Sequence, residues 1–341
     1  MRMKRKVLIV LAAAAAMMLQ VLPVSAEEAG VQAPSQEPFL TTYTVQQGDS
    51  LSAIADKMYG DRSAWKKLYK LNKDTIRDPH LIYAGQVLKL KAYRDIAFDH
   101  TWDYAGNAAI TDGMARLYRS DVKLRKNKTI CINAGHGTEG GADVKTLCHP
   151  DGSPKLVTGT TAAGATYATA ISKGVMMATG EPEASATLRA AFFVKDELLK
   201  AGYDVLMIRE SDDVQLDNIA RTLIADHYAD AHIALHYDST TNDKGVFFCS
   251  VPDSESYRNM EPVSSWWQLH DMLGRCLIMG LEGEGLSKWK NGELEMDLTQ
   301  TSYSTIPSVD LEIGDTVSDR SDAVLSSVAR GIRAGLDLFF A

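Results

Sequence analysis

From Lys128 to the end of the chain, short apolar runs alternate with longer amphipathic stretches. The apolar runs read TICINAG, YDVLMIR, AHIALHY, GVFFCSV and SVDLEIG. Helical patterns separate and follow them, at about 184–201, around NIARTLIADHYA, about His270 and at the C-terminal end. Strands that alternate with helices predict an α/β domain, whose twisted, mostly parallel sheet has helices on both faces. Binding sites in such sheets gather at the carboxyl ends of the strands.

Candidate site residues stand at three of these strand ends. His136 follows the first strand with a glycine on each side, which leaves room for other groups to approach the ring. His236 ends AHIALH, and Glu312 ends SVDLE. Two imidazoles with carboxylates suit a catalytic zinc site, where three protein ligands leave a position for water. Glu181 and Glu183 both precede the long helix, and either can supply the third ligand.

A second, smaller unit lies near the N-terminus, within residues 42–91. YTVQ predicts a strand, and Asp49 or Ser50 can cap a helix whose apolar face holds Leu51 and Ile54. A second helix around WKKLYKL and a closing strand, QVLKL, complete a βααβ unit.

This unit resembles a LysM domain in YTVQQGDSLSAIADKMYG, in the asparagine of LNKD and in its IYAGQVLKL ending. The resemblance implies binding of glycans that contain N-acetylglucosamine, including peptidoglycan. It places the glycan groove between two loops. The residues that it implies are Gly48, Asp49, Ser50 and Leu51 in the first loop, and Ile76 and Ile82 in the second.

The larger domain, residues 128–341, resembles the zinc-dependent N-acetylmuramoyl-L-alanine amidases. The resemblance rests on INAGHG, EASATLRAAFFVKDELLKAGYDVLMIR, IARTLIADHYADAHIALHYDS and IPSVDLEIG, in that order. It implies one zinc ion held by His136, Glu183 and His236, because Glu183 is in register when counted back from AGYDVLMIR. It also implies that Glu312 is the catalytic carboxylate, which binds no metal. Such a carboxylate accepts a proton from the attacking water and passes it to the leaving amine.

Near the site, two residues depart from the family pattern and a third matches it. Asn133 replaces the aspartate of the signature, and we expect it to orient His136 through a hydrogen bond. Asp310 replaces an apolar residue and shares a strand face with Glu312, whose pKa it can therefore change. Arg221 matches a recurrent arginine of the family, and a structural ion pair explains it equally well.

The remaining segments complete the predicted organisation. Residues 1–26 have a basic start, an apolar core and a Val-Ser-Ala end, as in a cleaved signal peptide, and 27–41 read as a flexible leader. Residues 92–127 form an aromatic connector that we expect to pack on the second domain. The glycine, threonine and alanine content of the insertion 138–181 predicts an ordered, turn-rich loop over the site. His149 within it is a conceivable additional ligand.

Charge and cysteine content exclude other classes. The formal charge of −8 becomes −12 when residues 1–26, with four basic and no acidic residues, are removed. An acidic chain of this kind is not a general nucleic-acid binder. No second apolar span follows the signal, so no membrane anchor remains after cleavage. The four cysteines are widely spaced and form neither a zinc ribbon nor a disulfide framework. We expect Cys131, Cys249 and Cys276, in apolar contexts, to be buried thiols, and a single bridge stays open.

Together these features predict a secreted or wall-associated hydrolase. Its LysM unit binds peptidoglycan glycan, and its zinc domain cleaves the amide between N-acetylmuramic acid and L-alanine of the stem peptide. Two alternatives stay open: a zinc peptidase that acts within the stem peptide, and a non-catalytic wall-binding protein with a degenerate amidase domain.

Overall fold

The computed structural model describes residues 42–59, 62–90 and 93–341. The predicted signal peptide, 1–26, and the leader, 27–41, lie outside these ranges. Within them, no helix has the length and apolar character that crossing a bilayer requires.

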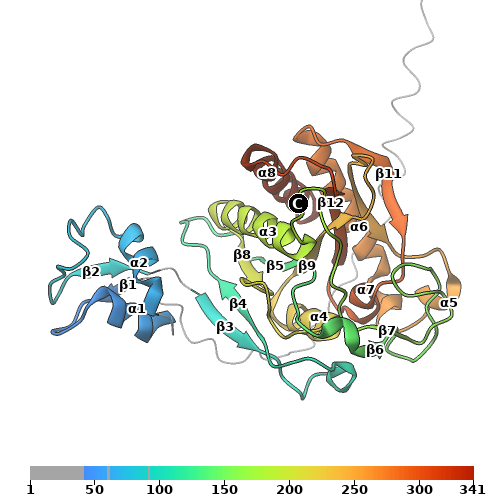
Figure 1. The fold of residues 1–341 in the computed structure, drawn as a ribbon, viewed down its shortest axis with the longest axis horizontal. Coiled ribbons are helices and arrows are strands. Elements are labelled where there is room, and N and C mark those ends of the chain that lie inside the picture. Colours follow the sequence, from blue (N-terminus) through green and yellow to red (C-terminus); the bar gives the residue numbers. More distant parts are fainter. Residues whose placement is uncertain (1–41, 60–61, 91–92) are drawn as a thin grey trace, which may run out of the picture. The chain divides into compact units, whose positions relative to one another are not determined.

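The N-terminal unit has the predicted βααβ order (Figure 1). Its elements are β1 (Thr42–Thr44), α1 (Leu51–Tyr59), the 3-10 turn η1 (Arg62–Ala64), α2 (Trp65–Leu71) and β2 (Val87–Lys89), with β1 and β2 antiparallel. Ser50 caps α1, since its Oγ accepts a hydrogen bond from the Ala53 amide at 3.2 Å. A core of its own, which includes Ile54, Leu68 and Leu88, holds the unit together.

The C-terminal domain is built on one eight-stranded sheet, with several helices around it. The strands of this sheet are β3 (Tyr93–Ala97), β4 (Met114–Tyr118), β5 (Thr129–Ala134), β8 (Asp204–Met207), β9 (Ala231–Asp238), β10 (Val246–Ser250), β11 (Lys288–Glu295) and β12 (Ser308–Asp315). The helices are α3 (Glu183–Lys200), α4 (Asn218–Tyr228), α5 (Glu255–Arg258), α6 (Val263–Gly283), α7 (Thr299–Tyr303) and α8 (Asp322–Phe339), with 3-10 turns η2 (Ala105–Asn107) and η3 (Gly141–Asp143).

The strand order is β11-β10-β12-β9-β5-β8-β4-β3. The four central strands, β12, β9, β5 and β8, are parallel to one another, whereas β10 and β4 pair antiparallel to β12 and β8. The predicted α/β class is confirmed, and the sheet is mixed. Parallel strands buried on both faces read as continuous apolar runs, and the centre of the sheet has such runs.

Helices cover both faces of the sheet (Figure 1). On one face, α3, α6 and α8 pack on a core that includes Leu198, Leu277 and Leu336. On the other face, α4 and α7 contribute Ile219 and Tyr303 to a second core. The carboxyl ends of β5, β9 and β12 therefore meet at one edge of the sheet, between the two layers of helices.

The segment predicted as a connector is part of the sheet. Its strands β3 and β4 extend the sheet beyond β8, and Trp102 and Tyr104 pack against the core beneath α4. The apolar pattern of these strands is too short and irregular to stand out in the sequence. The insertion contains η3 and a two-stranded ribbon, β6 (Lys145–Leu147) with β7 (Tyr167–Thr169), and otherwise turns.

Candidate metal centre

His136 lies in the loop directly after β5. Its φ of 64° is in the left-handed region, and this turns the ring away from the strand direction. A Cβ on the preceding residue, Gly135, would lie 2.3 Å from Cε1 of His236, so only glycine lets the two rings approach. The Nδ1 atom of His136 lies 2.8 Å from the Ser172 carbonyl, to which it donates. The unprotonated Nε2 is then free to bind a metal.

Glu183 is the first residue of α3, and its carboxylate turns back toward the sheet. Oε1 accepts a hydrogen bond from the Tyr237 amide at 3.1 Å, and Oε2 accepts one from the Val175 amide at 3.0 Å. A Cβ on Gly174 would lie 2.7 Å from Oε2, so the insertion passes very close to the carboxylate. Two backbone donors and a close-packed loop thus hold the Glu183 side chain in one position.

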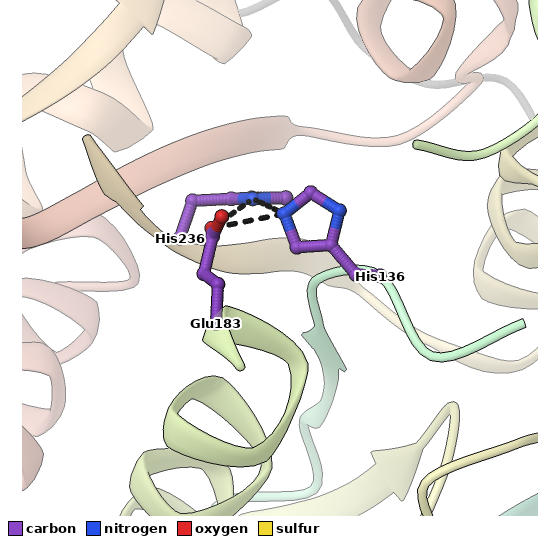
Figure 2. Close-up of side chains that lie close together, drawn as sticks. All are labelled: His136, Glu183 and His236. Atoms are coloured by element: carbon purple, nitrogen blue, oxygen red, sulfur yellow. Dashed lines mark hydrogen bonds and ion pairs between the residues drawn. The ribbon is translucent and has the colours of Figure 1, made fainter. Parts of the chain in front are cut away.

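His236 completes a cluster of three side chains from three separate elements (Figure 2). Its Nδ1 lies 3.0 Å from Nε2 of His136 and 3.1 Å from Oε1 of Glu183. Nε2 of His136 and Oε1 of Glu183 are 2.9 Å apart. One donor atom from each residue lies within 4.8 Å of the others, so a single ion can reach all three.

The electrostatics of the cluster favour a positive charge. Burial alone would lower the pKa of His236, but the carboxylates of Asp310, Glu183 and Glu312 raise it to about 10. Although burial opposes ionisation of Glu183, hydrogen bonds and charge from His136 and His236 hold its pKa well below the usual value. Two imidazole nitrogens and an ionised carboxylate are a donor set that fits zinc. These residues therefore fit the metal that the family resemblance implies.

Glu312 and Asp310 are the carboxylates of β12 next to this cluster. Glu312 is in register with His236 on the neighbouring parallel strand. Burial, and next the charge of Asp310, raise the pKa of Glu312 well above its usual value. Within the described part of the chain, Oε2 of Glu312 and Oδ1 of Asp310 are buried without a hydrogen-bond partner. A buried, unpaired carboxylate oxygen is unfavourable unless it faces a ligand, water or ion.

Two buried arginines support the loop that carries His136. Arg221 donates to the His136 carbonyl at 2.7 Å and to Oδ1 of Asn133 at 3.1 Å. Arg209 donates to the carbonyls of Ala134 and Gly135, at 2.9 and 2.8 Å. Burial, followed by the charge of Arg209, lowers the pKa of Arg221 to about 9.

These contacts correct the expectation for Asn133 and bear on the two readings of Arg221 that the sequence left open. Asn133 does not orient the His136 ring, because Ser172 bonds Nδ1 of that ring and the Asn133 side chain bonds Arg221. The hydrogen bonds of Arg221 go to backbone carbonyls and neutral side chains, so it is a support for the loop rather than half of an ion pair.

Other candidate residues lie apart from the cluster. Glu181 has a half-exposed side chain, with Oε2 3.8 Å from Nε of Arg320, so the structure favours Glu183 over Glu181. His149 is buried in the insertion, where its Nε2 lies 3.0 Å from Oδ2 of Asp297 and its Nδ1 lies 2.9 Å from Ser153. It is therefore occupied by a structural contact.

In the LysM unit, the predicted groove residues divide into two groups. Leu51 and Ile76 belong to the core, with 2% and 1% of their surface exposed, so their side chains cannot contact a glycan. Asp49 accepts hydrogen bonds from the Tyr43 hydroxyl and the Gln46 amide. Gly48 and Ser50 shape the turn before α1, and Ile82 packs at the edge of the core. A glycan role for this loop stays a prediction.

Sequence reasoning missed Ser172 and Arg209 as supports of the centre. Ser172 lies in a turn-rich segment with no pattern that marks it. Arg209 carried a signal, because a charged residue that ends an apolar strand must find partners when it is buried.

The mixed α/β sheet and the histidine–glutamate cluster at the ends of its parallel strands define the class of a candidate metallohydrolase. A family model described as N-acetylmuramoyl-L-alanine amidase matches residues 130–333, and a LysM domain model matches residues 43–91. Since the first match covers more than half of the chain, the chain belongs to the N-acetylmuramoyl-L-alanine amidase family. The prediction of an N-acetylmuramoyl-L-alanine amidase with a LysM domain is confirmed at the level of the family.

Among solved structures, the chain resembles the N-acetylmuramyl-L-alanine amidase Ami1 from Mycobacterium smegmatis. The TM-score is 0.50 at 16% identity, and the match covers 63% of this chain and 97% of that one. At this identity the likeness shows the fold alone. Ami1 from Mycobacterium abscessus matches with a TM-score of 0.49 at 18% identity, over 64% of this chain and 100% of that one.

Among curated relatives, the potassium binding protein Kbp from Escherichia coli is 44% identical over 48 residues, which are 14% of this chain and 32% of that protein. The uncharacterised protein YqbP from Bacillus subtilis is 45% identical over 58 residues, covering 14% of this chain and 26% of that protein. The chain thus spans about a third or less of the curated relatives that it matches.

Proposed function

We propose that this chain hydrolyses the amide bond between N-acetylmuramic acid and the L-alanine of the peptidoglycan stem peptide, with zinc bound by His136, Glu183 and His236. The observation that carries the proposal is the convergence of these three side chains within 4.8 Å, from the end of β5, the start of α3 and the end of β9. The unpaired carboxylate of Glu312 beside them supports a catalytic role for that residue.

The residues divide the chemical work among them. When bound, a zinc ion supplies a Lewis acid that polarises the amide carbonyl and lowers the pKa of a water molecule. In its ionised form, Glu312 accepts the proton of the attacking water on Oε2 and returns it to the nitrogen of the leaving L-alanine. Ser172 keeps the proton of His136 on Nδ1, so that Nε2 carries no proton and can bind a metal. Glu312 is half-buried, and its Oε2 is shielded from bulk solvent.

We also propose that residues 1–26 direct export and that the LysM unit binds peptidoglycan glycan, so that the mature protein acts outside the cell or at the wall. Both family matches support this proposal, because a LysM domain and an amidase domain act on the same polymer. A single weak glycan-binding module raises the local concentration of the catalytic domain at the wall.

The first test compares the protein starting at Glu27 with its Glu312→Gln variant, for zinc content and for products released from purified peptidoglycan. We expect about one zinc per chain in both, and stem peptides with an N-terminal L-alanine only from the wild type. The rate for the variant should be about 100- to 10,000-fold lower, since a positioned acid–base group contributes roughly that factor. Treatment with a chelator should stop the wild-type reaction, and added zinc should restore it.

A matched control is Glu181→Gln, which removes the neighbouring carboxylate that lies outside the cluster and should keep both zinc and activity. Fragments cut within the stem peptide would instead establish a peptidase. Zinc binding without any product would show that the domain is not a catalyst for this polymer.

A further inference from the structure

The edge strand β11 contains an irregularity beside the catalytic region. Val246 of β10 pairs with Lys288, whereas Phe248, two residues on, pairs with Glu293, so β11 holds three additional residues over this step. Lys290 within this bulge has a φ of 46°, an unusual value for a residue other than glycine. Bulges of this kind often lie next to active sites, where they redirect a side chain.

The side chain that this bulge carries is Trp289. Its half-buried ring lies over Phe247, with the ring centroids 5.1 Å apart and the planes at 49°. Phe247 pairs directly with Glu312 across the antiparallel β10–β12 ladder, so these two side chains share a face of the sheet. The next residue, Phe248, points to the opposite face, where its ring leaves no room for a Cβ on Gly274 of α6. Trp289 therefore lies on the Glu312 face.

Residues of four neighbouring strands thus form a row on this face. His236 of β9 is followed by Glu312 of β12, Phe247 of β10 and Trp289 of β11. With neighbouring strands about 4.8 Å apart, Trp289 is about 14 Å from His236. An extended peptide covers that length in about four residues. A stem peptide whose first amide is at the metal centre can therefore reach Trp289 with its outer half.

Positive charge surrounds the tryptophan ring. The Lys244 ammonium lies 4.2 Å from the Trp289 centroid and 4.4 Å from that of Phe247, and it pairs with Asp238. The Lys290 ammonium lies 4.2 Å from the Trp289 centroid on an exposed side chain. Within the described ranges, Lys290 forms no ion pair with an acidic side chain. It is thus a cation held in place by an aromatic ring, with its charge available.

This charge matters because the row begins in a strongly negative region. The charges of Asp310, Glu183 and Asp238 all act on Glu312. An acidic peptide that enters this region needs a compensating cation further along its length. A neutral sugar has no such requirement, so the lysine favours a peptide over a glycan as the occupant.

We propose that Trp289 and Lys290 form a subsite for the outer half of the stem peptide, in which the indole packs on the peptide and the Lys290 ammonium binds one of its carboxylates. This inference rests on the proposed function and deepens it, because it places an acidic peptide along the row that leads from His236 to Trp289. Phe247 packs against the indole at a tilt. Lys244, which pairs with Asp238, lies over the indole ring.

The test measures binding rather than turnover, so that it does not depend on catalysis. The parent protein is the full chain carrying Glu312→Gln. Calorimetry at low ionic strength gives its Kd for two compounds: an N-acetylmuramoyl tetrapeptide with free carboxylates, and the same compound with its carboxylates amidated. The parent should bind the acidic compound more tightly. Lys290→Gln should weaken binding of the acidic compound about three- to tenfold and leave the amidated one unchanged, as expected for a partly exposed charged contact. Trp289→Ala should weaken both.

Lys288→Gln is the matched control. It removes the same charge two residues away, from a lysine that pairs with Glu282 at 3.0 Å, and it should change neither Kd more than about twofold. Equal binding of the two compounds by the parent, or a Lys290→Gln effect that does not distinguish them, would overturn the subsite. So would a Trp289→Ala loss that is as large for N-acetylmuramic acid without a peptide. Turnover by the chain with Glu312 intact is measured separately, so a failure of the amidase proposal is distinguishable from a failure of the subsite.

Discussion

Asp310 is the residue whose contacts most affect how His236 is held. Its Oδ2 lies 3.5 Å from Nε2 of His236, while Nδ1 of the same ring faces His136 and Glu183. A carboxylate on the outer nitrogen favours the tautomer that leaves the inner nitrogen free to bind a metal. The aspartate is half-buried, and its Oδ1 is buried with no partner among the described residues.

We therefore predict that Asp310→Leu and Asp310→Asn weaken zinc binding by about tenfold or more, since loss of such a partner costs roughly 10- to 100-fold in metal affinity. Competition with a chelator of known affinity measures the change directly. Leucine is informative because it fills this half-buried position without any polar atom. If both variants bind zinc as tightly as the wild type, Asp310 does not position His236.

At the scale of elements, the contact between α4 and the turn after α7 contains a half-buried acid, Asp226. Asp226 of α4 accepts a hydrogen bond from the Ser304 hydroxyl at 2.9 Å, and its second oxygen is unpaired within the described part of the chain. Burial raises the pKa of Asp226 to about 7. The folded protein therefore holds this proton up to near-neutral pH, whereas the unfolded chain releases it near pH 4.

The sign of the stability effect follows from this difference. Between about pH 4 and 7 the folded state binds the proton and the unfolded state does not, so this group makes the free energy of unfolding fall as the pH rises. The full change is on the order of 4 kcal/mol over that window. Asp226→Asn removes the titration, so the stability of the variant relative to the wild type should increase from pH 4.5 to 8.

Urea unfolding of both proteins at pH 4.5, 6 and 8 checks this prediction. Ser304→Ala is a useful companion, because loss of the hydroxyl donor should extend the falling region to higher pH. A difference between Asp226→Asn and wild type that stays constant across the three pH values would contradict the assignment.

At the scale of the whole molecule, the sequence pattern predicted the elements with strong periodicity. The five apolar runs became β5, β8, β9, β10 and β12, and the helix expected at 184–201 is α3, Glu183–Lys200. The pattern did not predict β3, β4 and β11. Strands β11 and β3 are the two edges of the sheet, and β4 lies next to β3. Half-exposed residues such as Arg94 and Trp289 interrupt the apolar signal of the edge strands.

The candidate centre was predictable because its residues adjoin strands with a strong apolar pattern. His136, His236 and Glu312 follow or end strong strand signals, and the topology brings the ends of parallel strands together. The supports of the centre depend on turns and on long-range contacts. Ser172 reaches His136 across 36 residues, and nothing in the residues around it indicates that contact.

The LysM unit has a hydrophobic core of its own, separate from those of the sheet domain. We predict that a chain starting at Lys91 keeps its activity on a soluble N-acetylmuramoyl peptide within about twofold, because none of the residues proposed for catalysis belongs to the LysM core. On insoluble peptidoglycan its rate at low enzyme concentration should fall several-fold to about tenfold, since the module supplies local concentration and not catalytic contacts. Sedimentation with peptidoglycan measures the binding, and release of stem peptides measures the rate.

Tyr83→Ala in the full chain, at a ring with 63% of its surface exposed, tests the glycan surface without removing the unit. If the chain starting at Lys91 lost as much activity on the soluble peptide as on insoluble peptidoglycan, the LysM unit would contribute to the active site itself.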